Sequence, residues 1–265
     1  MLSACTTSKL VNRSTRPYAP MQRQLVEIDA RLRAKHGMTT EQAAAGVLDL
    51  RTGRVAMIHP DRIEYAASVP KIGILLAYFH IHPEGPDAET AHELGLMVKA
   101  SSNEMATKHS RAIGLENVQK ILGGYGFYDP LRGGGLWFGK HYGPNSERIG
   151  DPVGDHSHAA TVRMLLRFYQ QLDAGRLVSP AASKRMREIF LSPDIPHDQH
   201  KFVKALEGRG LTLLRKWGSW QDYLHDTALV EGPNRRYVIA ALTHHPAGDA
   251  YLEDLGREVD DMMSR

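Results

Sequence analysis

Apolar residues recur at helical spacing at both ends of the chain. The residues that share one face of the first helix are Met21, Leu25, Ile28 and Leu32. Those that share one face of the last are Leu252, Leu255, Val259 and Met262, in a helix that we expect Asp249 to cap. Because residues three or four apart lie on the same side of a helix, both segments are predicted to pack one face against a core.

Strand-like runs form two groups that lie far apart in the sequence. Residues 43–50 and 54–59 flank Arg51-Thr52-Gly53, which predicts a hairpin. The later runs cover residues 211–217, 228–230 and 237–243. The helical signals between the groups cover residues 72–80, 90–100, 104–113 and 159–172, with a glycine-rich stretch at 123–143. Neither group can form a full sheet alone, so we expect one mixed lobe split around an inserted helical lobe, with a site where the two lobes meet.

The predicted fold class is therefore α+β, with an antiparallel sheet flanked by N- and C-terminal helices and an inserted all-helical lobe. Residues 21–265 are expected to form one domain, in which residues 21–66 and 176–265 build the α/β lobe and residues 67–175 the helical lobe. Residues 1–20 are predicted to be a flexible tether, because the stretch before Met21 is polar, contains prolines and shows no periodicity.

Composition argues against nucleic-acid binding and against a membrane-spanning segment. The chain of 265 residues has a formal net charge of +3 from dispersed acids and bases, without the basic stripe that nucleic-acid binding needs. The longest uncharged apolar run, residues 72–79, is far shorter than the roughly 20 residues of a membrane span. We expect a monomer that acts on a small molecule or a peptide.

The single cysteine, Cys5, excludes an internal disulfide. Leu2-Ser3-Ala4-Cys5 resembles a bacterial lipobox, although a chance match is the alternative. Four preceding residues are too few for a signal peptide, so the chain would have to begin inside its precursor. We therefore expect a lipid anchor at Cys5 as the only membrane contact, and a periplasmic or cell-envelope location.

Ser68 and Lys71 are the first candidate catalytic residues. Pro70 suits the first turn of the apolar helix that follows, so Ser68 is predicted to lie at a helix N-terminus. Residues three apart share a helix face, so the Lys71 amine can remove the serine proton. The alternative is that Ser68 only caps the helix and Lys71 is solvated.

Ser101-Ser102-Asn103 follows the apolar run that ends near Val98 and precedes the next predicted helix. A hydroxyl and a carboxamide two residues apart can both face one cleft. The alternative is that Ser102 or Asn103 caps that helix, a role worth about 1 kcal/mol without any function.

Lys216-Trp217-Gly218-Ser219 ends a predicted strand, and its glycine would let a substrate approach the backbone closely. Two other K-x-G triplets occur, at Lys35 and Lys71, but neither follows a strand signal.

The ordered set S-x-x-K, S-x-N and K-x-G resembles the class A β-lactamase and penicillin-binding protein superfamily, with a transpeptidase-like fold, over residues 21–265. Residues 101–114 look like that family's S-D-N helix, and residues 155–160 look like the end of its ω-loop.

The resemblance implies a role for each motif residue. Ser68 would be the nucleophile and Lys71 its base, with its pKa lowered by burial and by the Lys216 cation. Ser101 would relay a proton to the leaving group, and Asn103 would contact a substrate amide. Lys216 would hold a substrate carboxylate beside Gly218. The N–H groups of Ser68 and Ser219 would form the oxyanion hole.

Three departures from the family pattern bear on substrate and turnover. Ser102 stands where the family has Asp, and the short interval from Ser68 to Ser101 indicates a missing loop at the cleft. Trp217 replaces a small hydroxyl residue. The ω-loop E-x-x-L-N signature, whose glutamate activates the deacylating water, is absent. Glu147 is the nearest substitute, and the alternative for it is a solvated loop acid.

The lesser substitutes for that glutamate are Tyr142 and Asp151, whereas Asp155 is more simply the cap of the next helix.

No metal or cofactor is expected. The fourteen histidines include His156-x-His158, His197-x-x-His200 and His244-His245, but none has an H-E-x-x-H arrangement. The Gly123 to Gly143 stretch lacks a P-loop motif, and Trp137 within it is expected to serve packing.

The prediction is a serine hydrolase that forms an acyl-enzyme at Ser68 on a β-lactam, amide or ester. The alternatives are an esterase or D,D-peptidase of the same fold, and a non-catalytic module that binds cell wall or peptide.

Overall fold

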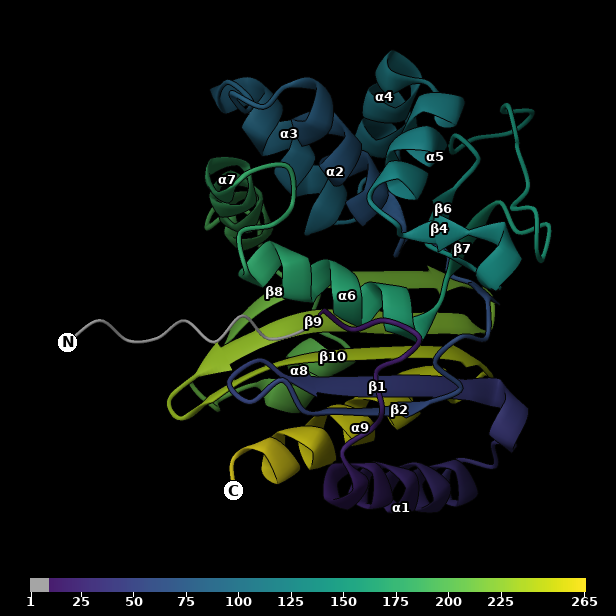
Figure 1. Cartoon of the computed structure of the whole chain (residues 1–265), viewed down its shortest axis with the longest axis vertical. Coiled ribbons are helices and arrows are strands. Elements are labelled where there is room, and N and C mark those ends of the chain that lie inside the picture. Colours follow the sequence, from purple (N-terminus) through teal and green to yellow (C-terminus); the bar gives the residue numbers. More distant parts are fainter. Residues whose placement is uncertain (1–9) are drawn as a thin grey trace.

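The structure is a computed structural model that describes residues 10–265. Its centre is a five-stranded antiparallel sheet in the order β2-β1-β10-β9-β8 (Figure 1). Its strands are β1 (Ala43–Asp49), β2 (Val55–Ile58), β8 (Thr212–Trp220), β9 (Tyr223–Gly232) and β10 (Arg235–His244). The two strand groups of the sequence meet where β1 pairs with β10, with Ala43 opposite Thr243. The predicted α+β class and split sheet are confirmed.

The N- and C-terminal helices cover the same face of this sheet (Figure 1). They are α1 (Ala19–Lys35) and α9 (Gly248–Met263), with the short helix α8 (Phe202–Leu206) packed beside α9. Successive β1 side chains alternate between two core clusters, so that Val47 faces these helices and Leu48 faces the opposite layer. One detail of the prediction was wrong: Asp249 lies in the first turn of α9, and Ala247 is its N-cap.

The other face of the sheet carries α6 (Val162–Asp173), and the remaining helices pack beyond it (Figure 1). They are α2 (Lys71–Ile81), α3 (Ala88–Val98), α4 (Asn103–Ile113), α5 (Leu115–Gly124) and α7 (Pro180–Leu191). The lobe boundary expected at residue 175 falls later, because α7 packs against α2 and α3 through buried residues such as Phe190. Within residues 10–265, no helix combines the length and apolarity needed to cross a membrane.

Short strands that the sequence pattern did not predict connect the two lobes. A three-stranded sheet has the order β3-β7-β6, from β3 (Glu64–Tyr65), β6 (Trp137–Phe138) and β7 (His158–Ala160). A two-stranded sheet pairs β4 (Tyr128–Asp129) with β5 (Gly134–Gly135), and single 3-10 turns cover Thr40–Gln42 and Pro130–Arg132. Strands of two or three residues are too short to show an alternating pattern.

The segment before α1 is packed onto the domain in the part that the structure describes. Val11 is 1% exposed, and its N–H donates to Gln170 Oε1 on α6 at 2.7 Å. The Tyr18 N–H donates to Val55 O on β2 at 2.8 Å. The flexible tether predicted for residues 1–20 is therefore wrong for residues 10–20, because a buried valine anchors them. Cys5 lies outside the described residues.

Candidate active site

Ser68 lies in a tight turn that leads directly into α2. The Val69 N–H donates to Ala66 O at 2.9 Å and the Lys71 N–H to Ser68 O at 3.3 Å, so the turn continues into the helix. Ala67 has a φ of 47°, a left-handed conformation that costs a non-glycine residue about 1–2 kcal/mol. Such strain persists only where the surroundings enforce it, and it is common at functional sites. The turn leaves Ser68 on the wall of a cleft, 9% exposed.

The edge strand β8 approaches this turn at Gly218. A Cβ atom at Gly218 would lie 2.7 Å from Ala66 O and 2.9 Å from Ser68 N. Backbone atoms cannot move aside as a flexible side chain can, so only glycine permits this approach. The prediction assigned the space at Gly218 to a substrate, but the structure shows the Ser68 turn there.

A buried lysine that the sequence did not single out, Lys201, holds the same part of β8. Its Nζ donates to Gly218 O at 3.1 Å and to Ser219 Oγ at 2.6 Å, and lies 3.5 Å from Asp249 Oδ1. The C=O and N–H of a trans peptide unit point in opposite directions. By holding the Gly218 oxygen, Lys201 therefore turns the Ser219 N–H away from itself, and Ser219 lines the cleft.

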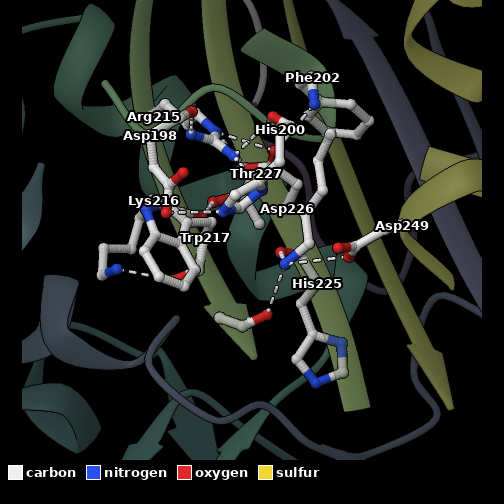
Figure 2. Close-up of polar contacts among 12 residues, drawn as sticks. Asp198, His200, Phe202, Arg215, Lys216, Trp217, His225, Asp226, Thr227 and Asp249 are labelled. Atoms are coloured by element: carbon white, nitrogen blue, oxygen red, sulfur yellow. Dashed lines mark hydrogen bonds and ion pairs between the residues drawn. The ribbon is translucent and has the colours of Figure 1, made fainter. Parts of the chain in front are cut away.

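Beside Lys201, an ion pair between Arg215 and Asp226 joins β8 to β9 (Figure 2). Both side chains are completely buried, and the Arg215 Nε lies 2.8 Å from Asp226 Oδ2. Arg215 also donates to the carbonyl oxygens of Asp198 and His200. Through these bonds Arg215 connects residues 198–200 to β8, the strand that carries Lys216. Removing one partner of the buried ion pair would leave an uncompensated charge, so both side chains are needed to keep this connection.

Lys71 projects from the first turn of α2 into a set of neutral acceptors. Its Nζ donates to Ser101 O at 2.6 Å and to Asn103 Oδ1 at 2.7 Å, and lies 3.4 Å from Ser101 Oγ. Burial lowers the pKa of Lys71 to about 7. A lysine with this pKa is partly neutral near pH 7, as a general base must be. Burial supplies this shift, whereas the sequence argument had added the charge of Lys216.

Lys216 reaches the same serine from β8. Its Nζ donates to Ser101 Oγ at 2.8 Å and to Trp217 O at 2.6 Å. Lys71 and Lys216 therefore both meet Ser101, but neither side chain lines the cleft. Burial, and then the cations of Lys71 and Arg215, hold the pKa of Lys216 well below its ordinary value. The side chain is 0% exposed and does not line the cleft, so a ligand carboxylate could reach it only if the residues that cover it moved.

Each residue of the Ser101-Ser102-Asn103 motif makes a different contact. Ser102 Oγ accepts a hydrogen bond from the Met105 N–H at 3.2 Å and caps α4, as the structural alternative proposed. Ser101 has a φ of 62°, which places its carbonyl and hydroxyl oxygens within reach of Lys71. Asn103 lines the cleft while it holds Lys71.

The structure does not bring Glu147 to the cleft lining. Its side chain is 63% exposed, and its nearest basic partner is His141 Nε2 at 3.8 Å. Asp151 is buried, where it accepts hydrogen bonds from the Tyr128 hydroxyl and from backbone N–H groups of its own turn. Asp155 was wrongly predicted as a helix cap: Thr161 caps α6, and Asp155 pairs with Arg148.

The cleft beside Ser68 has a volume of about 430 Å³ and an aromatic rim. Its lining combines Ser68, Asn103 and Ser219 with residues that sequence reasoning had given little or no role, namely Tyr65, Lys140, His141, Tyr142, His158 and Trp220. Trp220 is 59% exposed. No carboxylate side chain is among the described residues that line the cleft.

The cleft histidine His158 belongs to a hydrogen-bonded network. His158 has both ring nitrogens engaged, with Ser157 Oγ at 3.0 Å and Lys140 O at 3.1 Å. Burial, and then the nearby Lys71 cation, lower the pKa of His158 to about 3, so its ring is neutral at physiological pH. Across residues 10–265 the structure groups no three potential metal ligands.

Comparison with known proteins gives a family from the sequence and a matching fold from the structure. A family model described as "Beta-lactamase enzyme family" matches residues 85–262. No curated protein sequence matches the chain. A class A β-lactamase from Mycobacterium abscessus has 15% identity and a TM-score of 0.74, covering 91% of this chain and 100% of its own. A β-lactamase from Sphaerobacter thermophilus has 18% identity and a TM-score of 0.69, with coverage of 91% and 97%.

A third similar structure is a mutant of PBP-A, solved as an acyl-enzyme complex with penicillin G. It has 20% identity and a TM-score of 0.70, and the match covers 93% of this chain and 97% of that one. At these identities the likeness concerns the fold alone.

Proposed function

Because the chain belongs to the β-lactamase enzyme family and is a serine hydrolase, we propose that it forms an acyl-enzyme at Ser68 with a β-lactam, an amide or an ester. The observation that carries the proposal is the connected group at the cleft. Lys71 and Lys216 meet at Ser101, Asn103 holds Lys71, and Ser68 forms the adjoining wall. This group supplies a nucleophile, a partly neutral amine and a hydroxyl relay in one place.

In the proposed reaction, neutral Lys71 accepts the proton as Ser68 Oγ attacks the carbonyl carbon. The N–H groups of Ser68 and Ser219 stabilise the oxyanion; Gly218 and Lys201 together hold their two backbone segments in place. Ser101, within 3.4 Å of Lys71 Nζ, passes the proton to the departing nitrogen or oxygen. Asn103 contacts a substrate amide from the cleft wall. Glu147 is not needed for these steps.

An ester substrate is the candidate that one further observation favours. Both lysines of the motif set are fully buried and their ammonium groups are occupied by protein oxygens. The cleft therefore presents few fixed charges to a ligand carboxylate, with Lys140 as the cation on its lining. Aromatic walls at Tyr65, Tyr142 and Trp220 suit an apolar acyl or leaving group.

Intact-mass analysis tests the mechanism directly. The wild-type protein would be exposed to penicillin G and, separately, to p-nitrophenyl acetate, and the adduct located by peptide mapping. We expect an acyl group on Ser68 and no adduct on Ser68→Ala. Ser146→Ala, a change on the neighbouring loop, is the control and should label normally. Stoichiometric labelling of Ser68→Ala would show that Ser68 is not the nucleophile.

We also propose that the enzyme works as a monomer in the bacterial cell envelope, anchored by a lipid on Cys5. The support is the lipobox-like sequence before Cys5. Cells that express the full precursor, as wild type or as Cys5→Ser, would be fractionated. We expect the wild-type protein in the membrane fraction and the Cys5→Ser protein in the soluble fraction. Equal membrane content of both proteins would contradict the anchor.

A further inference from the structure

Tyr142 contacts both members of the proposed nucleophile pair, although no motif includes it. Its ring lies under the Lys71 ammonium, with Nζ 4.3 Å from the ring centroid. Its hydroxyl donates to Ala67 O at 3.5 Å, next to the nucleophile, and accepts a hydrogen bond from the Ser68 side chain. The Tyr142 side chain thus contacts Lys71 with the face of its ring and Ser68 with its hydroxyl.

The surroundings hold this ring rigidly. His158 stacks on it, with ring centroids 5.0 Å apart and planes at 27°, and Phe138 packs at 6.1 Å. The Tyr142 N–H donates to Thr107 Oγ1 at 3.1 Å, while the Thr107 hydroxyl lies 3.3 Å from Tyr142 O. The ring is therefore held from its stacked face and from its backbone.

The phenol is neutral in this environment. Burial raises the pKa of Tyr142, and the hydrogen bond from Ser68, which lowers this pKa, offsets only part of the rise. A phenol that keeps its proton cannot act as the base that the ω-loop glutamate supplies in related enzymes. It can donate a hydrogen bond to an oxygen that carries developing negative charge.

We propose that Tyr142 is a catalytic residue that donates a hydrogen bond to Ser68 Oγ as that oxygen loses its proton, and that stabilises the protonated form of Lys71 through its ring. This inference rests on the proposed acylation of Ser68. During acylation the Oγ–H bond breaks, its proton moves to Lys71 Nζ, and the new ammonium lies over the ring. During deacylation water adds to the acyl carbon and gives a proton to neutral Lys71, the bond from that carbon to Oγ breaks, and the phenol O–H stabilises Oγ until Lys71 passes that proton to it. Tyr142 keeps its own proton throughout.

Two substitutions separate the two contacts. Tyr142→Phe removes the hydroxyl and keeps the ring over Lys71, whereas Tyr142→Leu removes both. The matched control is Tyr125→Phe, since the Tyr125 hydroxyl also hydrogen-bonds a side chain, His80 Nδ1 at 3.2 Å, but away from the cleft. Acylation would be measured in single turnovers with p-nitrophenyl acetate and with nitrocefin, at a temperature where each variant is folded by circular dichroism.

We expect the acylation rate to fall about tenfold in Tyr142→Phe, to fall about tenfold further in Tyr142→Leu, and to be unchanged in Tyr125→Phe. If wild type is acylated and Tyr142→Phe reacts at the same rate, this inference is overturned while the proposed function stands. An equal loss in Tyr125→Phe would also overturn it. If neither compound acylates the wild-type protein, the proposed function and the inference both fail.

Discussion

Two buried lysines near the cleft show how the immediate neighbours decide the charge of a residue. Lys71 donates to a backbone carbonyl and to a carboxamide oxygen, both neutral. Burial therefore lowers its pKa to about 7. Lys201 is as deeply buried, and burial also lowers its pKa, but the charges of Asp226 and Asp249 oppose the change. The first lysine is suited to accept a proton, and the second to remain a fixed cation that orients a peptide unit.

The protonation state of Lys71 predicts how the activity depends on pH. Below its pKa of about 7 the folded enzyme carries a protonated Lys71, which cannot accept the serine proton. We therefore expect kcat/KM to rise with pH up to about 7 and then to level, with a slope of about tenfold per pH unit on the acid side. A pH–rate profile measured with p-nitrophenyl acetate checks this, and a flat profile across neutrality would contradict it.

The lowered pKa of Lys71 also makes the free energy of unfolding depend on pH. The unfolded chain binds a proton at Lys71 up to its ordinary pKa of 10.5, whereas the folded protein releases it above about 7. Stability attributable to this residue therefore rises with pH between these two values and is lowest below pH 7, where folding must bury the charge.

Among the elements, the segment of residues 139–157 borders the cleft. It forms the rim of the cleft with Lys140, His141 and Tyr142, and places Glu147 in solvent. The sequence argument tied fast deacylation to a carboxylate in this segment. The structure places no carboxylate on the described lining.

We expect β-lactam turnover to be limited by deacylation. General-base assistance is commonly worth about 10²–10⁴-fold, so its loss leaves acylation by Lys71 as the faster step. Stopped-flow assays with nitrocefin should show a burst before slow hydrolysis, and mass spectrometry should find the adduct on Ser68 for minutes. Rapid turnover without a burst would point to another base, for which His141 on the same lining is the first candidate.

The edge strand β8 depends on Lys201 for the orientation of the Gly218–Ser219 peptide. Lys201→Met should lower kcat by about tenfold or more with little change in KM, because oxyanion stabilisation acts in the transition state. Lys204→Met, within the helix α8 that Lys201 precedes, is the control, since Lys204 pairs with Glu253 at the surface and the change should leave kcat unchanged. The assay is done below the melting temperature of each variant, and equal kcat values for both would exclude this role.

In the whole molecule, α6 lies between the sheet and the helices α2, α3, α4, α5 and α7 (Figure 1). Arg163, at the start of α6, joins three segments. The guanidinium pairs with both oxygens of Asp61, at 2.7 and 2.8 Å, and donates to Asn12 O at 2.7 Å. Asp61 follows β2, and Asn12 belongs to the segment that Val11 anchors. Arg163 therefore connects the N-terminal segment to both lobes.

We expect Arg163→Ala to lower the free energy of unfolding by about 1–3 kcal/mol, because the bidentate pair of a buried guanidinium with the partly exposed Asp61 and a further charged hydrogen bond are lost together. Urea denaturation followed by fluorescence measures this. Arg132→Ala, whose side chain is 71% exposed and paired with Asp129, should change stability by less than about 0.5 kcal/mol. A comparable loss in both variants would contradict the role assigned to Arg163.

The sequence by itself determined the features that depend on neighbours along the chain. Helical spacing identified α1 and α9, and the Arg51-Thr52-Gly53 turn identified the β1–β2 hairpin. The order of the three motifs, with a strand before Lys216, indicated the family and the catalytic candidates. These signals are readable because helix and strand periodicity act over a few residues.

Only the tertiary structure decided which distant residues share the site. Lys201 reaches Ser219, and Tyr142 reaches Ser68 and Lys71, through contacts that no local pattern records. It also showed that Gly218 makes room for the Ser68 turn, that Glu147 points to solvent, and that Val11 is buried. Each of these outcomes depends on how loops and lobes pack in three dimensions, because burial and close approach are set by residues far away in the chain.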